Sequence, residues 1–190
     1  MSEVNTRPRD TRARKAAGVV RLYPDGYAGA WKTWPQIALR SDVRALDPEF
    51  RKRVHAMMRE AHKQGVAVGI GGGGRTTAQQ TTLFLSRHYP DPSGSIYWNG
   101  QRWSRKAGVA AAAPPGLSWH ETAPAPLGGA IAVDAVGDLN WVGKNAGWFG
   151  LKDFSDVNSE AWHLQPVELP NSRSAWDRVT GLRDWFVRKR

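Results

Sequence analysis

Four side chains in the second half of this sequence have types and spacing suited to metal-dependent chemistry. Glu160 and His163 stand three residues apart in the stretch NSEAWHLQP, and His120 and Asp134 lie upstream. Two histidines and one aspartate form a three-ligand set of nitrogen and oxygen, which leaves the fourth position of a zinc ion open to water. A nearby carboxylate that is not a ligand can take a proton from that water and pass it to a leaving amine. Glu160 is suited to this role while His163 binds the metal.

The same residues also have an ordinary structural interpretation. Histidines are commonly core or surface residues, and a glutamate three positions before a histidine often occurs by chance. Asp134 is predicted to end the apolar strand AIAVD, where a buried charge is costly unless it is paired or bound to a metal. The remaining histidines stand in basic or helical contexts, and we expect them to be structural: His55, His62 and His88. From residue types and spacing alone, both interpretations of the site stay open.

Composition limits the kind of metal site and the kind of partner. The chain has 190 residues, ten tryptophans and 41% hydrophobic residues, which suits one domain with a substantial core. It contains no cysteine, so any metal must be held by histidine, aspartate or glutamate. Lysine and arginine number 27 against 17 acidic residues, a net charge of +10. That charge favours a polyanionic partner: nucleic acid, an anionic membrane surface or the bacterial wall.

The beginning of the chain is polar and rich in arginine. We expect residues 1–18 to form a flexible basic arm, followed by a single domain over residues 19–190. No stretch resembles a signal peptide or a membrane span. A target outside the cytoplasm would therefore have to be reached by another route.

Apolar spacing and punctuating residues predict the elements that position the site. Asp47 and Pro48 open a helix that Gly65 stops, and Thr76 or Thr77 caps a second helix over Ala78–Arg87. The other expected features are a strand at Val66–Ile70, a hairpin turn at Asn99-Gly100, a short helix near Val142–Ala146, a strand from Glu160 broken by Pro166, an amphipathic stretch over residues 176–186, and irregular structure from Leu22 to Trp34. Together they predict an α+β fold, in which a small antiparallel sheet carries the site and helices pack on one side.

A glycine-rich stretch offers a competing interpretation. GIGGGGRT, residues 69–76, has nearly the form of a phosphate-binding P-loop between a strand and a helix. The position that requires lysine is occupied by Arg75, and a guanidinium is not equivalent to a compact ammonium charge. Four consecutive glycines also match a generic tight turn. The nucleotide site is therefore the weaker hypothesis.

Several motifs resemble those of the zinc D-Ala-D-Ala carboxypeptidase family, which includes vancomycin-resistance carboxypeptidases and dipeptidases and phage L-alanyl-D-glutamate endopeptidases. SWHE with AIAVD, followed by EAWHLQP, resembles the family signatures S-x-H…A-x-D and E-x-W-H. GGRTTAQQ is similar to the element G-Y-R-S-x-x-x-Q, and GWFGL to a short aromatic-glycine stretch ahead of the catalytic glutamate. The resemblance spans about Val66 to Pro166 in the family's order, and it implies the hedgehog/D-Ala-D-Ala-peptidase type of α+β fold.

The resemblance implies a role for each matching residue. His120, Asp134 and His163 would bind one zinc ion, and Glu160 would be the general base and acid. Arg75 would stabilise the carbonyl oxygen as it becomes an oxyanion, an effect often worth ~3 kcal/mol. The two remaining matches, Gln80 and Ser118, would bind substrate.

The sequence departs from the family pattern in three places. Thirteen residues separate His120 from Asp134 where the family usually has six, and TAPAPLGG, residues 122–129, has the composition of a loop insertion. Because of this insertion, Glu121 and Asp138 are alternative third ligands. Ala130 stands where the family has glycine, and Gly74 where it has tyrosine. The missing tyrosine puts the aromatic wall of the substrate site elsewhere, or removes it.

The function implied is hydrolysis of a peptide bond in the stem peptides of bacterial peptidoglycan. The basic charge and the absence of a signal peptide favour a phage endolysin, a monomer that accumulates in the host cytoplasm and reaches the wall through holin-made holes. Basic ends at Arg7–Lys15 and Arg188–Arg190 are candidates for binding anionic wall polymers, and we expect neither nucleic-acid binding nor membrane insertion. The alternatives are a bacterial D-Ala-D-Ala carboxypeptidase, a virion-associated wall hydrolase, and a non-catalytic basic module that binds wall polymer or nucleic acid. Three bonds are candidates for cleavage: L-Ala–D-Glu, D-Ala–D-Ala, or one in a cross-bridge.

Overall fold

The structure is a computed structural model that describes residues 22–26, 30–122, 129–154 and 160–169. The predictions for the basic arm over residues 1–18, for the basic ends, for the amphipathic stretch and for most of the insertion lie outside these residues. Within the described part of the chain, no helix is both long and apolar enough to span a membrane.

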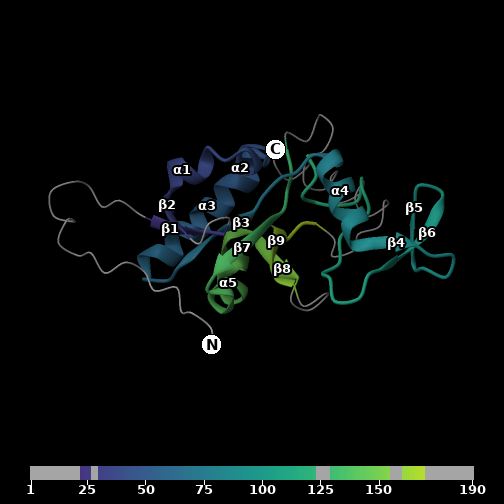
Figure 1. Ribbon diagram of the computed structural model, residues 1–190. Helices are drawn as coiled ribbons and strands as arrows, with labels where there is room; N and C mark the ends of the chain where they lie inside the picture. The colour runs from purple at the N-terminus through teal and green to yellow at the C-terminus, as the bar shows by residue number, and fades with distance from the viewer. Residues whose placement is uncertain (1–21, 27–29, 123–128, 155–159, 170–190) are drawn as a thin grey trace.

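A six-stranded sheet forms the centre of the molecule (Figure 1). Its strand order is β2-β1-β3-β7-β9-β8, and among these neighbours only β1 and β3 run parallel. The strands are β1 (Leu22–Asp25), β2 (Ala30–Thr33), β3 (Val68–Gly72), β7 (Val133–Gly137), β8 (Leu151–Phe154) and β9 (Glu160–Pro166). The expected α+β fold with a mainly antiparallel sheet is therefore confirmed.

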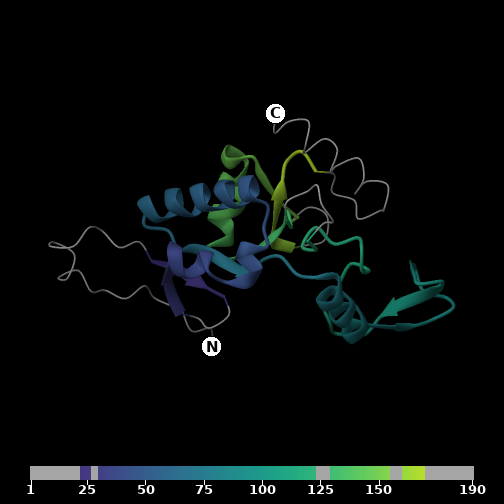
Figure 2. The ribbon, with the colours of Figure 1, turned by 90° about the horizontal axis from the view of Figure 1, so that it is seen from above.

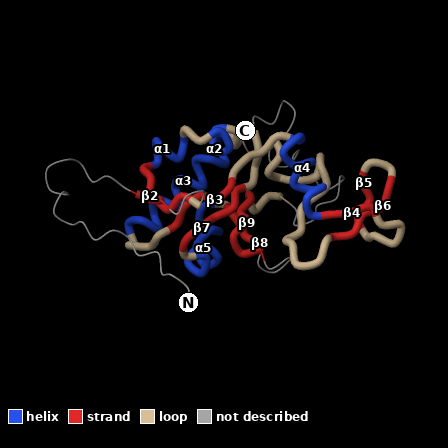
Figure 3. The backbone as a smooth tube through the Cα atoms, in the orientation of Figure 1, coloured by secondary structure: helices blue, strands red, loops and turns tan. Residues whose placement is uncertain are grey.

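The helices are short, apart from two that were predicted from the sequence. They are α1 (Trp34–Ala38), α2 (Ser41–Arg44), α3 (Pro48–Lys63), α4 (Thr77–Arg87), α5 (Leu139–Asn145) and the 3-10 helix η2 (Ala146–Phe149). Figure 3 shows them in blue around the red strands. Residues of α3 and α5 are buried in one core together with residues of β3, β7 and β9. The residues that β3 and β7 contribute to this core are alternate ones. Since alternate residues of a strand point to the same face, the core covers one face of the sheet.

The two long helices begin and end as the sequence predicts. Asp47 caps α3 by accepting hydrogen bonds from the backbone N–H groups of Glu49 and Phe50, and Gly65, with φ of 75°, follows its end. The side chain of Thr76 caps α4 and forms a capping box with Gln79.

A smaller sheet lies apart from the main one, beyond α4 (Figures 1 and 2). It consists of β4 (His88–Pro90), β5 (Ile96–Trp98) and β6 (Gln101–Arg105), in the order β4-β6-β5. The predicted turn at Asn99-Gly100 is confirmed, since both residues have positive φ, as a two-residue turn of type I′ requires. Phe84 and Trp103 pack edge to face and fix the sheet to α4.

The histidines expected to be structural all pack against aromatic rings. His55 stacks on Trp34 with ring centroids 3.9 Å apart, and His62 lies 5.8 Å from the ring of Tyr23. His88 is buried and stacks on Phe84 at the end of α4.

Two predictions about strands were wrong. Residues 22–34 were expected to be irregular, but β1 and β2 form an antiparallel pair, and Tyr23 is 2% exposed. The strand was not predicted because proline argues against a strand in the middle of a sheet. Pro24 is tolerated here because β1 pairs with β3 only at Asp25. Asp134 was expected at the end of its strand, but it is the second residue of β7. Two of the preceding apolar residues, Ala130 and Ile131, make backbone hydrogen bonds outside the sheet instead, to Ala45, Asp47 and Trp119.

An arginine at the start of α2 ties three elements together. The guanidinium of Arg40 donates to the carboxylates of Asp25 and Asp42 and to the carbonyl oxygens of Ile70 and Gly71. Asp25 is 1% exposed and also pairs with Lys32. Arg40 therefore compensates a buried charge and holds the end of β3 against α2.

We predict that Arg40→Leu destabilises the fold by about 3 kcal/mol, because it removes one of the two cations that pair with Asp25 and leaves two backbone carbonyls without this donor. Urea denaturation of the purified variant would measure the change. Arg44→Leu is the matched control, since Arg44 is exposed on the same helix, and it should change stability by no more than about 0.5 kcal/mol. Equal stability of the two variants would contradict the role given to Arg40.

Candidate metal centre and active site

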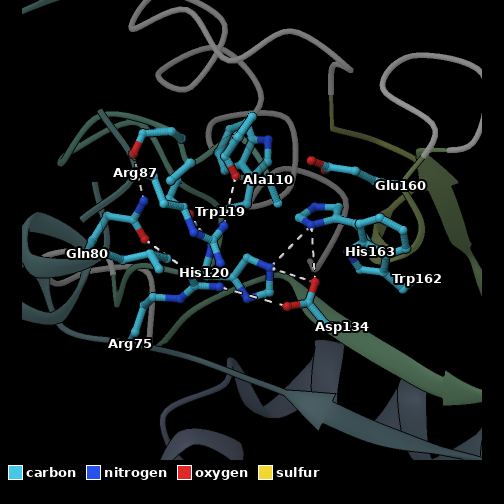
Figure 4. Close-up of a pocket in the computed structure, with 15 residues that line it drawn as sticks. Arg75, Gln80, Arg87, Ala110, Trp119, His120, Asp134, Glu160, Trp162 and His163 are labelled. Carbon is cyan, nitrogen blue, oxygen red and sulfur yellow. Dashed lines mark hydrogen bonds and ion pairs between the residues drawn. The ribbon is translucent and has the colours of Figure 1, made fainter. Parts of the chain in front are cut away.

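Three of the predicted residues come together at one point of the sheet (Figure 4). Nε2 of His120 lies 3.2 Å from Nδ1 of His163 and 3.3 Å from Oδ1 of Asp134. Nδ1 of His163 lies 3.7 Å from the same carboxylate oxygen. Among the described residues, this is the group of histidine and acidic side chains whose ligand atoms converge closely enough to hold a metal ion.

The pairing of β7 with β9 positions two of these three side chains, those of Asp134 and His163. Asp134 and His163 are cross-strand partners, as are the neighbouring residues Val133 and Leu164. Because side chains alternate between faces, Val133 and Leu164 enter the core while Asp134 and His163 point to the opposite face.

The third member, His120, comes from a loop that is fixed by backbone hydrogen bonds. The N–H of Arg75 donates to the carbonyl of His120 at 2.7 Å, and Nδ1 of the imidazole lies 2.9 Å from the carbonyl oxygen of Gly73. A carbonyl oxygen only accepts, so Nδ1 carries a proton, and Nε2 is the ring nitrogen whose lone pair a metal ion would take. That nitrogen is the one facing Asp134 and His163, and a backbone carbonyl orienting a histidine in this way is typical of metal ligands.

The donor set fits a zinc ion. It offers two imidazole nitrogens and one carboxylate oxygen, and three protein ligands with one open position is the arrangement found in catalytic zinc sites. His120 and His163 are 4% and 5% exposed, so an ion bound here would be largely shielded from solvent on the protein side.

The ionisation of Asp134 is consistent with a ligand. Burial alone would raise the pKa of its carboxyl group, but the opposing charge of His120 and hydrogen bonds from His120 and His163 hold that pKa well below its usual range. Arg75 adds a positive charge, with Nη2 3.9 Å from Oδ2 of Asp134.

Arg75 is oriented by the other predicted residue of its motif. Its Nη1 donates to the side-chain oxygen of Gln80 at 3.1 Å, and the amide nitrogen of Gln80 donates to the carbonyl of Ala113. Gln80 is 1% exposed. It therefore positions the guanidinium beside the metal set, in addition to any contact with substrate.

Glu160 lies beside His163 for a reason that its spacing does not reveal. Residues three apart in a regular strand point to opposite faces. The register between β8 and β9 shifts here, because Lys152 pairs with Gln165 but Phe154 pairs with Glu160. This bulge turns the first residue of β9, so Glu160 and His163 line the same pocket (Figure 4).

The two alternative ligands have other functions. The carboxylate of Glu121 is buried and accepts hydrogen bonds from the backbone N–H groups of Gly116 and Ser118. Asp138 caps α5 through the N–H of Trp141. Asp134 is the acid that the structure brings to the histidines, despite the thirteen residues between it and His120.

The glycine run serves packing and positioning. The N–H of Gly74 donates to the carbonyl of Asp42, and that of Arg75 donates to His120, so these groups are not available to cradle a phosphate. A Cβ at Gly73 would stand 2.7 Å from the carbonyl oxygen of Asp42. The P-loop interpretation is therefore not supported.

A pocket of about 270 Å³ opens over the metal set. Ser118 and His120 line it, together with two aromatic residues, Trp119 and Trp162. A Cβ at Gly74 would already lie 3.0 Å from those of Ala45 and Ala130, so a tyrosine does not fit there. Trp162, 40% exposed, supplies an aromatic surface from β9.

Sequence reasoning missed Arg87, which also lines this pocket. The signal was present, since Arg87 follows Gln80 by seven residues and therefore lies on the same face of α4. Its significance depended on knowing that this face borders the site.

Comparisons with known proteins found similarity to solved structures only. No family model and no curated protein matches the chain. The LdcB LD-carboxypeptidase, described for peptidoglycan recognition, aligns with 22% identity and a TM-score of 0.46, over 78% of this chain and 71% of its own. The D,D-pentapeptidase VanY of a VanB-type resistance cassette, in complex with Zn(II), aligns with 15% identity and a TM-score of 0.44, over 88% and 90%. VanYB in complex with D-alanine-D-alanine gives 15% and 0.45, over 92% of each chain.

We predict that the chain binds one zinc ion and that His120→Ala abolishes binding, because only two ligands remain. Elemental analysis after dialysis against trace zinc would measure the stoichiometry. His62→Ala is the control, since His62 packs against Tyr23, and it should keep the metal. A wild-type chain that is folded and free of zinc after this treatment would rule out the site.

Gly73→Ala should weaken zinc binding about 10–100-fold, the usual effect of disturbing the partner of a ligand histidine. The new methyl group displaces the backbone from Asp42 and moves the carbonyl that orients His120. Gly147→Ala is the matched control, because a Cβ there meets nothing within 4 Å. Calorimetric zinc titration of both variants would show whether the carbonyl of Gly73 matters; equal affinities would mean that it does not.

Proposed function

We propose that this chain is a zinc-dependent peptidase that cleaves an amide bond in the stem peptides of bacterial peptidoglycan. The observation that carries the proposal is the convergence of His120, Asp134 and His163 in a pocket that Glu160 and Arg75 also line. The motifs that resemble the D-Ala-D-Ala carboxypeptidase family supply the substrate class.

Each residue of the pocket has a place in amide hydrolysis. When bound by the three ligands, a zinc ion would supply Lewis acidity that polarises a carbonyl and lowers the pKa of a water molecule. Glu160 lies at the edge of the pocket, beside His163, and accepts the proton of the attacking water. It then delivers this proton to the nitrogen of the leaving amine, since one carboxyl group can act first as base and then as acid.

Arg75 stabilises the charge that develops on the carbonyl oxygen. Its guanidinium is held by Gln80 on one side and lies near Asp134 on the other, so it is oriented before substrate arrives. Donors fixed in advance cost no reorganisation during the reaction. Such groups therefore often lower the activation barrier by ~3 kcal/mol. Ser118 is buried in the same pocket, where it can contact the substrate near the metal.

Within this class we propose a phage endolysin that accumulates in the host cytoplasm and reaches the wall after holin action. The net charge of +10 supports attraction to anionic wall polymers. A bacterial D-Ala-D-Ala carboxypeptidase and a virion-associated wall hydrolase are the alternatives, and the products released from purified peptidoglycan distinguish an endopeptidase from a carboxypeptidase.

We predict that Glu160→Gln retains zinc and fold but lowers peptide cleavage at least about 100-fold, because glutamine cannot accept the proton of the attacking water. Mass spectrometry of muropeptides released from several purified peptidoglycan types would measure cleavage and identify the bond. Glu60→Gln on the surface of α3 is the control and should cleave normally.

Undiminished cleavage by the Glu160→Gln variant would refute the proposed mechanism. Wall binding by the wild type without any cleavage, unchanged by a chelator, would instead support a non-catalytic wall-binding module.

A further inference from the structure

The face of α4 that holds Gln80 continues along the wall of the pocket. Gln80, Leu83 and Arg87 are spaced three and four residues apart, which places them on one side of a helix, and all three line the pocket over the metal set. Figure 4 shows Arg87 and Gln80 on the wall opposite Glu160 and His163. The pocket therefore holds a second arginine besides Arg75. This residue, Arg87, lies about two helical turns beyond Gln80 on α4.

Arg87 differs from the other arginines near the site in its partners. One nitrogen, Nη1, donates to the carbonyl oxygen of Ala111 at 3.0 Å. In the described part of the chain, no carboxylate lies within ion-pair distance of it. Arg40, by contrast, is paired with Asp25 and Asp42, and Arg75 faces Asp134. A guanidinium has five N–H donors, so Arg87 keeps most of its donors and its whole charge for a ligand.

Its position is also where two cavities meet. Arg75, Leu83, Arg87 and Asp134 line both the pocket over the metal set and a neighbouring cavity of about 1010 Å³. A peptide with its scissile carbonyl at the metal set and its chain in both cavities would pass along Arg87. Two other cations that line the larger cavity, Lys32 and Arg40, are already paired with Asp25 and Asp42.

We propose that Arg87 is a specificity-determining residue that binds a free carboxylate of the substrate, away from the bond that is cut. This inference rests on the proposed peptidase function and deepens it. A planar guanidinium binds a carboxylate through two parallel N–H···O bonds, and the contact to Ala111 fixes the orientation of the fork. A stem peptide with lysine at its third position offers two carboxylates of this chemistry: the one at its C-terminus and the free one of its D-glutamate.

The test compares peptide acids with peptide amides. Zinc-loaded wild type, Arg87→Gln and Arg87→Lys are assayed on a synthetic stem pentapeptide, on the same peptide amidated at its C-terminus, and on the peptide amidated at D-glutamate. Arg102→Gln is the matched control, because Arg102 also donates Nη1 to a single backbone carbonyl at 3.0 Å, but on the outer hairpin.

We expect wild type to prefer the acid over one of the two amides by about 10–100-fold in kcat/KM, the range for a hydrogen-bonded charge. Arg87→Gln should raise KM for the acid by a similar factor and bring the ratio of acid to amide close to one. Arg87→Lys should recover part of the preference, and Arg102→Gln all of it. The amide that removes the dependence on Arg87 identifies which carboxylate is bound.

Two results would overturn the inference: an unchanged ratio of acid to amide in Arg87→Gln, or an equal loss on all three peptides, which a structural role would produce. Calorimetry distinguishes failure of the inference about Arg87 from failure of the proposed peptidase function. If wild type cleaves none of the peptides, the peptidase proposal fails. Arg87 is then judged by whether zinc-loaded Glu160→Gln binds the acid at least about 10-fold more tightly than the matching amide, and whether adding Arg87→Gln removes that difference.

Discussion

The register between β7 and β9 is the constraint on which the rest of the site depends. Pairing Asp134 with His163 and Val133 with Leu164 divides one pair of strands into a core side and a site side. A slip of β9 by one residue would turn His163 into the core and Leu164 out of it, so burial of the core face also enforces the geometry of the metal set. The same burial that stabilises the fold therefore holds two of the three ligands.

The third ligand is held by backbone groups. His120 depends on the carbonyl of Gly73, and Gly73 depends on a close approach to Asp42 that a side chain would prevent. Arg40 fixes the same region from the other side through the carbonyls of Ile70 and Gly71. The glycine run that resembles a phosphate loop in the sequence thus connects α2, the end of β3 and the metal set.

Much of this could be predicted from the sequence where the signal is local. Caps and apolar spacing were sufficient for α3 and α4, and the Asn99-Gly100 dipeptide for its hairpin. The signal failed where tertiary contacts decide. Pro24 hid a strand that pairs with β3 at a single position, and the residues before Asp134 looked like strand but bond to loops. The structure brings together His120, Asp134 and His163, yet their convergence across an insertion was not a property of spacing.

The two carboxylates of the site, those of Asp134 and Glu160, suit different roles because they come from different parts of the sheet. Asp134 comes from a regular part of β7 and faces two imidazoles and a guanidinium, so its negative charge is favoured and it suits a ligand. Glu160 comes from the bulged start of β9 and stands outside the converging set, at the edge of the pocket. A base must exchange its proton with substrate, whereas a ligand must keep its charge. The bulge therefore does more than shift the register: it places a second acid within the pocket without adding it to the ligand set.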